Sequence, residues 1–246
     1  MKKSSPIRIL ASLLAFAIVL PAAAIANTAI EPAPRAGNWM KRHEGLVETA
    51  KTETACQVLF LGDSITDGWR GKGLAVWNEN YAPLHAVNLG ISGDRTQHLL
   101  WRLQNGELGA LRPKAIVMMI GTNNTGFESD KKTPRNTMPE IAEGVATLIK
   151  YLRAQLPDAK ILLLAVFPRG EKDSVPRVQV SEVNKLIAPL HDGKTVFFLD
   201  IGAKFLAPDG TLPRDIMPDL LHPNEQGYKI WAAAIKEPLA NLLGKN

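Results

Sequence analysis

The sequence predicts an α/β fold in which one parallel sheet is covered by helices on both faces. Two patterns lead to this prediction: apolar runs of strand length recur along the chain, and segments with the periodicity of amphipathic helices lie between them. Strands that alternate with helices need crossover connections, which are right-handed in nearly all known proteins. A doubly wound parallel sheet accommodates such connections most simply.

Five strands and several helices are expected. The strands are expected near residues 57–61, 85–89, 115–120, 160–166 and 195–199, and the helices near 39–51, 139–156, from about 176 and from about 224. The helix at 139–156 is the clearest, because Ile141, Val145 and Leu148 recur on one face. The last helix contains Pro238, which is expected to kink it or to end its regular part.

The first 26 residues have the features of an export signal. Lys2, Lys3 and Arg8 form a positively charged start, residues 9–20 form an uncharged apolar run, and residues 24–26 are the small residues of a cleavage site. A retained N-terminal anchor is the alternative, although a run of 12 residues is short for a bilayer span. We therefore expect a signal peptide at 1–26, a tether at 27–36 and a single domain at 37–246, in an exported, periplasmic or secreted protein.

Much of the basic charge belongs to the expected signal. The full chain has 29 basic and 24 acidic side chains and a net charge of +5. Removal of the three basic residues of the signal leaves 26 basic side chains and a net charge of +2. A nearly neutral chain without a cluster of Lys and Arg on one face predicts neither a nucleic-acid nor an anionic-membrane partner.

The lone cysteine, Cys56, excludes an intramolecular disulfide. It precedes the first expected strand, and free cysteines are usually buried, so we expect a small buried side chain. A pair of histidines at helical spacing together with a carboxylate would predict a metal site, and the sequence contains no such pair. The sequence therefore predicts neither a metal nor another cofactor.

A candidate nucleophile follows the first expected strand. The stretch from Val58 to Ser64, Val-Leu-Phe-Leu-Gly-Asp-Ser, is typical of a buried strand that ends in a turn and presents a serine. Ligands of open α/β sheets bind outside the carboxyl ends of the strands, so Ser64 lies where chemistry is expected. The alternative is a serine that caps the next helix.

A candidate base lies near the other end of the chain, in the sequence Asp219-Leu220-Leu221-His222-Pro223. In a turn, a spacing of three residues lets the Asp219 carboxylate reach one imidazole nitrogen of His222 while the other faces outward. A nucleophilic mechanism needs such a base and such an orienting carboxylate. The alternative is a buried loop in which Asp219 caps the last helix and His222 packs.

Two further strand ends carry candidate oxyanion donors. Gly93 lies in a glycine-bearing turn after the second strand, and Asn123 follows the third. A backbone N–H and a side-chain amide that converge on a developing oxyanion form an oxyanion hole. Glycine and asparagine are also common in ordinary turns, so each is weak support by itself.

Together, Gly62-Asp63-Ser64, Gly93, Asn123 and Asp219-x-x-His222 resemble the four blocks of the SGNH, or GDSL-type, hydrolase superfamily. The resemblance covers nearly all of residues 37–243. It extends beyond the blocks, in segments such as 98–108 and 168–172, to the catalytic alpha subunits of the intracellular platelet-activating factor acetylhydrolase. It implies a flavodoxin-like, three-layer α/β/α sandwich with a five-stranded parallel sheet.

The resemblance also implies a role for each site residue. Ser64 would be the nucleophile, His222 the general base and then the acid, and Asp219 its orienter. The oxyanion donors would be the backbone N–H groups of Ser64 and Gly93 and the side-chain amide of Asn123, while Gly90 is expected to be structural. The neighbouring side chains that would shape a small acyl pocket are Ile65, Thr122 and Leu221.

The expected function is therefore that of a serine esterase that removes a short acyl group, acetyl in the first place, through an acyl-enzyme. The resembling enzyme is cytoplasmic, whereas this chain carries an export signal, which favours O-acetylated carbohydrate over platelet-activating factor as substrate. The alternatives are a lysophospholipase or thioesterase for longer acyl chains and a catalytically idle binding module. The resemblance also suggests a homodimer.

Overall fold

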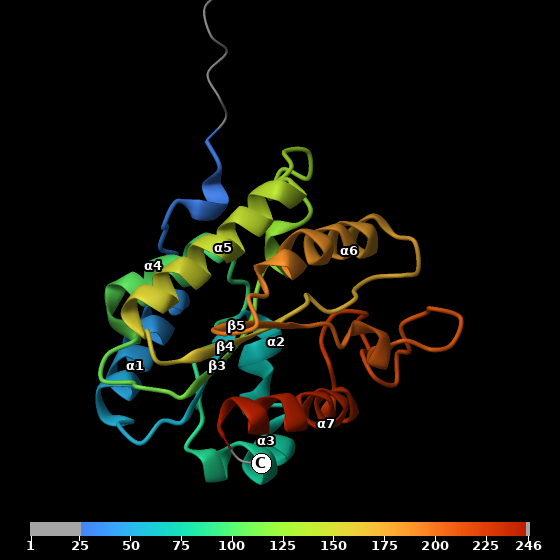
Figure 1. Ribbon diagram of the computed structural model, residues 1–246. Helices are drawn as coiled ribbons and strands as arrows, with labels where there is room; N and C mark the ends of the chain where they lie inside the picture. Colours follow the sequence, from blue (N-terminus) through green and yellow to red (C-terminus); the bar gives the residue numbers. More distant parts are fainter. Residues whose placement is uncertain (1–25, 245–246) are drawn as a thin grey trace, which may run out of the picture.

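The computed structural model describes residues 26–244, so all but the last residue of the expected signal peptide lies outside the described residues. The five strands form one parallel sheet in the order β2-β1-β3-β4-β5. This is the flavodoxin-like order, and the predicted five-stranded parallel sheet is confirmed. Strands β3, β4 and β5 of this sheet are labelled in Figure 1. The strands are β1 (Val58–Gly62), β2 (Val87–Asn88), β3 (Ala115–Met119), β4 (Lys160–Leu164) and β5 (Val196–Leu199).

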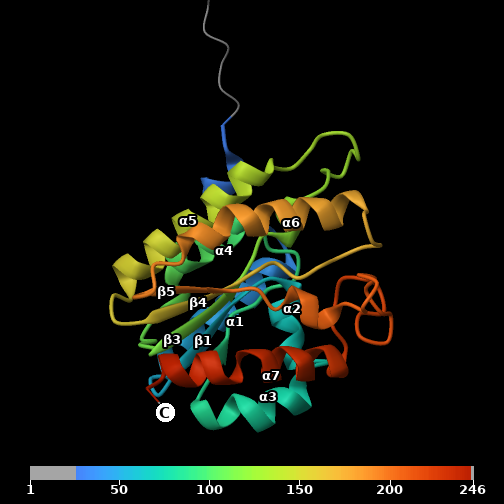
Figure 2. The ribbon, with the colours of Figure 1, turned by 45° about the vertical axis from the view of Figure 1, so that its right-hand side comes forward.

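Helices cover both faces of the sheet (Figure 2). They are α1 (Asn38–Thr52), α2 (Ser64–Asp67), α3 (Leu74–Asn80), α4 (Thr96–Arg102), α5 (Met138–Gln155), α6 (Val175–Ile187) and α7 (Glu225–Leu242). Buried side chains of α1, α4, α5 and α6 form one hydrophobic core, and those of α3 and α7 form the other. Within residues 26–244, no helix combines the length and the apolar character needed to cross a membrane.

The central strands are apolar because both of their faces are covered. Every residue of β1 and β3 is buried, and the two strands pair in register from Val58 with Ala115 to Gly62 with Met119. Continuous apolar runs of this kind are typical of parallel strands between two helical layers. The register brings the carboxyl ends of β1 and β3 together at one edge of the sheet.

The long helices start at recognisable caps. Thr137 and Glu140 form a capping box at the start of α5, in which the Thr137 N–H donates to Glu140 Oε2 over 2.7 Å. Asn224 caps α7 by accepting from the Gly227 N–H. The helix α7 runs through Pro238 to Leu242, so the alternative in which Pro238 ends the helix is wrong. Buried residues on both sides of the proline, including Leu239, stabilise the helix beyond it.

Residues 27–36, expected to be a tether, instead pack against the domain, and we call them the N-terminal strap. A short 3₁₀ helix, Thr28–Ile30, lies against α5 and α4, and its Ala29 is only 1% exposed. The Thr96 hydroxyl donates to the Ala29 carbonyl over 2.8 Å. The Ala-Pro composition shows no periodicity, so these distant contacts have no counterpart in the local sequence.

Cys56 is buried just before β1, as expected, and its thiol donates to the Val58 carbonyl. Burial raises the pKa of Cys56 to about 11. The thiol therefore stays protonated and unreactive at neutral pH.

Candidate active site

The turn after β1 presents Ser64 and leaves its hydroxyl free. Asp63, not Ser64, caps the short helix α2, because the Asp63 carboxylate accepts from the Ile65 N–H over 3.0 Å. The chain packs so closely here that a Cβ on Gly62 would lie 2.5 Å from the Met119 carbonyl oxygen. The alternative in which Ser64 serves as the cap is therefore wrong, and its side chain is available for another partner.

That partner is His222. The Oγ atom of Ser64 lies 2.9 Å from Nε2 of His222, although the two residues are 158 positions apart in sequence. On the other side of the ring, Nδ1 lies 2.6 Å from Oδ2 of Asp219. The three side chains form a hydrogen-bonded row in which the imidazole can take the serine proton while the carboxylate holds its orientation.

The Asp219 turn is built to hold this carboxylate in place. Its other oxygen, Oδ1, accepts the backbone N–H groups of Leu221 and His222 over 3.1 and 2.7 Å. Leu220 adopts a left-handed conformation with φ of 58°, and its carbonyl accepts from the Gly170 N–H. One carboxylate oxygen therefore stabilises the turn, and the other orients the imidazole.

Asp219 remains ionised through the neutral pH range. Its partial burial alone would raise its pKa, but the hydrogen bonds from the ring and the backbone of His222, and the positive charge that the ring can carry, hold the pKa at about 2. A carboxylate that stays charged at neutral pH can stabilise the imidazolium that forms when Ser64 loses its proton.

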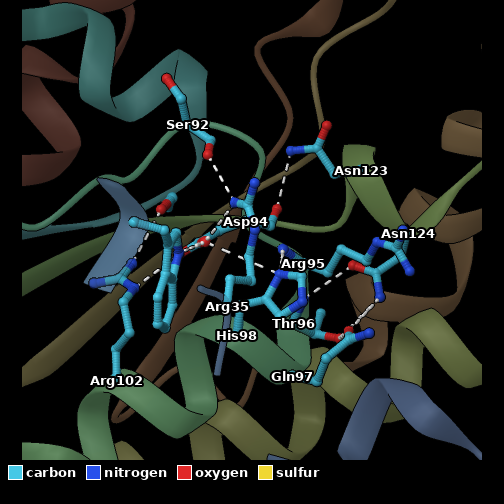
Figure 3. Close-up of polar contacts among 12 residues, drawn as sticks. Arg35, Ser92, Asp94, Arg95, Thr96, Gln97, His98, Arg102, Asn123 and Asn124 are labelled. Atoms are coloured by element: carbon cyan, nitrogen blue, oxygen red, sulfur yellow. Dashed lines mark hydrogen bonds and ion pairs between the residues drawn. The ribbon is translucent and has the colours of Figure 1, made fainter. Parts of the chain in front are cut away.

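Gly93 and Asn123 come together through Asp94. Gly93 has a left-handed φ of 79°, and the Asn123 side-chain nitrogen donates to the backbone carbonyl of the next residue, Asp94, over 2.9 Å (Figure 3). An amide nitrogen carries two hydrogens, so the Asn123 amide keeps one for a ligand. The Gly90 N–H, in contrast, is occupied by the Asn88 side chain, which agrees with a structural role.

The three residues expected around an acyl group differ in exposure. Ile65 and Thr122 are each 1% exposed, whereas Leu221 is half-buried. Ile65 is fixed through its carbonyl, which accepts from the Tyr228 hydroxyl over 2.7 Å. Leu221 is therefore the member of this set whose side chain has the most contact with solvent.

Arg169 is a site residue that sequence reasoning did not single out. Its Nη1 donates to the backbone carbonyl and to the hydroxyl of Thr122, next to Asn123, over 3.0 and 3.1 Å. Its positive charge is close enough to Asp63 and Asp219 to influence both. The available signal was its position, because Arg169 follows β4 at the same edge of the sheet as the other site residues.

Asp63 is a second site residue whose properties the sequence did not indicate. Its carboxyl is fully buried, and this burial raises its pKa to about 7, a rise that the nearby Asp94 charge increases and that the Ile65 N–H and the Arg169 charge oppose. A titratable group with a strongly raised pKa therefore lies directly before Ser64.

His43 and His98 have structural surroundings. His43 is buried with Nδ1 2.8 Å from a Glu107 oxygen. Burial lowers the pKa of His98 to about 4, and its Nδ1 accepts from the Arg95 N–H. Among residues 26–244, no three His, Cys, Asp or Glu side chains gather in a way that could hold a metal ion.

Comparison with known proteins agrees with these observations. A family model described as the GDSL-like lipase/acylhydrolase family matches residues 60–230. Platelet-activating factor acetylhydrolase IB subunit alpha2 of Gallus gallus is 38% identical over 206 residues, which are 83% of this chain and 83% of that protein.

Solved structures share the fold at lower identity. A GDSL-like lipase from Bacteroides thetaiotaomicron has a TM-score of 0.65 at 20% identity and covers 82% of this chain and 97% of its own. An acetyl xylan esterase has a TM-score of 0.63, also at 20% identity, and covers 74% of this chain and 99% of its own.

Proposed function

The chain belongs to the GDSL-like lipase/acylhydrolase family and has the three-layer α/β/α fold of the SGNH hydrolases, and from this premise we propose that it is a serine esterase for short acyl groups. The observation that carries the proposal is the hydrogen-bonded row of Ser64, His222 and Asp219, with contacts of 2.9 and 2.6 Å. Acetyl is the proposed acyl group. The Gallus gallus relative is a subunit of a platelet-activating factor acetylhydrolase, which supports this choice.

In the proposed reaction, Ser64 Oγ attacks the ester carbonyl while Nε2 of His222 takes its proton. The tetrahedral oxyanion accepts hydrogen bonds from the Gly93 and Ser64 N–H groups and from the free amide hydrogen of Asn123. His222 then gives the proton to the leaving alcohol, and an acyl-enzyme remains on Ser64. Water, activated by the same imidazole, releases the acid and restores the serine.

The charge of Asp219 contributes to both halves of this reaction. The imidazole becomes positively charged when it takes the serine proton, and the carboxylate 2.6 Å from Nδ1 stabilises that charge. The pKa of about 2 keeps this carboxylate ionised at neutral pH.

An acetylated carbohydrate is the proposed natural substrate. This part of the proposal rests on the expected export of the chain, because an exported esterase meets polysaccharides rather than cytoplasmic lipids. An acetyl xylan esterase shares the fold, so the fold can serve such a substrate. Export is tested by N-terminal sequencing of the protein from the producing cell, with a start near residue 27 as the expected result.

The acyl-length profile tests the proposed activity. Wild type and Ser64→Ala are compared on the p-nitrophenyl esters of acetate, butyrate and octanoate. The proposal expects the highest kcat/KM on acetate and its loss in the variant. A preference for octanoate would support the lysophospholipase or thioesterase alternative, and a folded wild type without activity on any of the three would support the idle binding module.

A further inference from the structure

The N-terminal strap brings an arginine to the turn that carries Gly93. The strap is held at its start, where the Asn27 side chain donates to Glu143 on α5 over 2.8 Å, and in its middle, where Ala29 is buried and bonded to Thr96. The backbone N–H of Ala33 also donates to α4, at the Gln97 carbonyl. These contacts fix the path of the strap toward its last residues.

Arg35, near the end of the strap, lies directly against the Gly93 turn (Figure 3). Its Nη1 donates to the Ser92 carbonyl over 2.9 Å and lies 3.4 Å from a carboxylate oxygen of Asp94. A Cβ atom built on Gly93 would lie 3.1 Å from both terminal nitrogens of Arg35. The guanidinium therefore holds the residues on both sides of Gly93 and fills the space next to Gly93 itself.

Asp94 connects Arg35 and the Gly93 turn to the protein interior. Its carboxylate is buried and accepts from Trp39 Nε1 over 2.6 Å and from Arg102 Nε over 2.7 Å. Burial raises the pKa of Asp94, and the charges of Arg102 and Arg35 and the Trp39 hydrogen bond oppose that rise. The fully buried Arg102 also pairs with Glu107, which holds the guanidinium in place. Buried partners therefore fix the position of the Asp94 side chain.

The same residue fixes the second oxyanion donor. The backbone carbonyl of Asp94 accepts from the Asn123 amide over 2.9 Å (Figure 3). A shift of the turn at residues 92–94 would therefore move both the Gly93 N–H and the Asn123 amide. Glycine is the residue with the greatest backbone freedom, so the direction of its N–H depends on what its neighbours hold in place.

We propose that Arg35 is a positioning residue for the oxyanion hole, and that the N-terminal strap holds it against the Gly93 turn. Its guanidinium fixes the Gly93 N–H directly and the Asn123 amide through Asp94. Hydrogen-bond donors that are already oriented stabilise an oxyanion without reorganisation during the reaction. Arg35 touches neither the nucleophile nor the base, and the inference rests on the proposed esterase function for its effect on rate.

Loss of Arg35 leaves the fold intact because Asp94 keeps two buried donors. In Arg35→Ala the turn gains freedom, and kcat on p-nitrophenyl acetate is expected to fall about 10-fold. This is less than the roughly 10²- to 10³-fold loss on removal of a donor itself. The KM is expected to stay within about twofold, because the ground-state ester makes little use of the hole. Arg35→Lys is expected to recover much of the loss, since an ammonium also donates to the Ser92 carbonyl.

Arg112→Ala is the matched control. Arg112 also donates to backbone carbonyls, those of Gly109 and Leu111, but it precedes β3 at the opposite edge of the sheet. Its removal is expected to leave kcat unchanged. In a double-mutant cycle, Arg35→Ala and Asn123→Ala should together cost less than the product of their separate losses, because both act on the same pair of donors.

Hydrogen exchange provides a readout that does not depend on activity. In the full chain, backbone exchange in the peptide that spans residues 89–97 should rise in Arg35→Ala and stay unchanged in Arg112→Ala. Unchanged exchange in this peptide would overturn the positioning role whether or not the protein hydrolyses esters. Raised exchange with an unchanged kcat would overturn its link to catalysis. A wild type without esterase activity would contradict the proposed function, while the exchange result would still decide whether Arg35 orders the turn.

Discussion

The Nε2 atom of His222 lies 2.9 Å from the Oγ atom of Ser64, across a sequence separation of 158 residues. The fold brings them together because β1 ends at the carboxyl edge of the sheet and the loop before α7 returns to the same edge. This contact relates the fold to the proposed chemistry.

Asp219→Asn is expected to lower kcat on the order of 10³- to 10⁴-fold. The amide oxygen can still accept from the backbone N–H groups of Leu221 and His222, so the turn should remain. The amide nitrogen, however, would donate to Nδ1 and leave the proton on Nε2, which faces Ser64. Steady-state kinetics and circular dichroism measure the two effects, and a folded variant with more than about a tenth of wild-type kcat would contradict the assigned role.

Asn123→Ala is expected to lower turnover about 10²- to 10³-fold, because one oxyanion donor is lost. Asn105→Ala is the control, since Asn105 also donates its amide to a backbone carbonyl, that of Trp101, but on the exposed surface. The control should keep wild-type turnover. Unchanged turnover in a folded Asn123→Ala protein would remove Asn123 from the site.

Leu221→Ala is expected to widen the acyl preference. Leu221 is half-buried, so its truncation should open space at low cost to stability, whereas Ile65 and Thr122 are fully buried. Pocket contacts with one methylene are worth about 10- to 200-fold in discrimination. We expect the ratio of kcat/KM on butyrate to that on acetate to rise at least about 10-fold. An unchanged ratio would show that Leu221 does not limit acyl length.

Asp63 is expected to make stability depend on pH. Its native pKa of about 7 lies above the ordinary 3.8, so the native state binds the proton more tightly than the unfolded state. This contribution is fully present below about pH 4 and is lost as the pH rises through 7. It amounts to about 4 kcal/mol at most, because one pKa unit corresponds to about 1.4 kcal/mol.

Urea unfolding of wild type and Asp63→Asn at several pH values measures the contribution of Asp63 to the free energy of unfolding. Asparagine can still accept from the Ile65 N–H but does not titrate, so the stability of wild type relative to the variant should fall between pH 4 and pH 7. The same pH dependence in both proteins would show that Asp63 titrates normally.

Arg102→Ala is expected to destabilise the fold by about 3–5 kcal/mol, because it leaves the buried Asp94 and Glu107 carboxylates without their shared partner. The exposed pair of Lys185 and Glu182 provides the comparison. Lys185→Ala should change the free energy of unfolding by less than about 0.5 kcal/mol. A change as small as this in Arg102→Ala would show that the buried pairs contribute little.

The strands and the candidate catalytic residues were predictable because their sequence signals are local. Apolar runs marked β1 and β3, and the Asp219-x-x-His222 spacing marked a carboxylate and an imidazole that could meet in one turn. The sequence could not decide between Ser64 as nucleophile and as helix cap. The structure assigns the cap to Asp63.

The strap was not predictable, because its contacts depend on distant partners. Asn27 bonds a residue 116 positions away, and Arg35 meets Ser92 at a separation of 57. Neither contact leaves a periodic pattern or a motif in the sequence. The same holds for Asp94, which was part of a glycine-bearing turn in the sequence and becomes the buried link between Arg35, Arg102 and the Asn123 amide.

The most direct test of the proposed mechanism is the site at which a fluorophosphonate modifies the protein. An activated serine attacks the phosphorus and displaces fluoride, and the adduct remains for peptide mass spectrometry. We expect one equivalent of label on Ser64, a loss of p-nitrophenyl acetate hydrolysis in proportion to labelling, and no label in Ser64→Ala. Hydrolysis that persists after complete labelling, or label on another residue that accounts for the loss of activity, would contradict it.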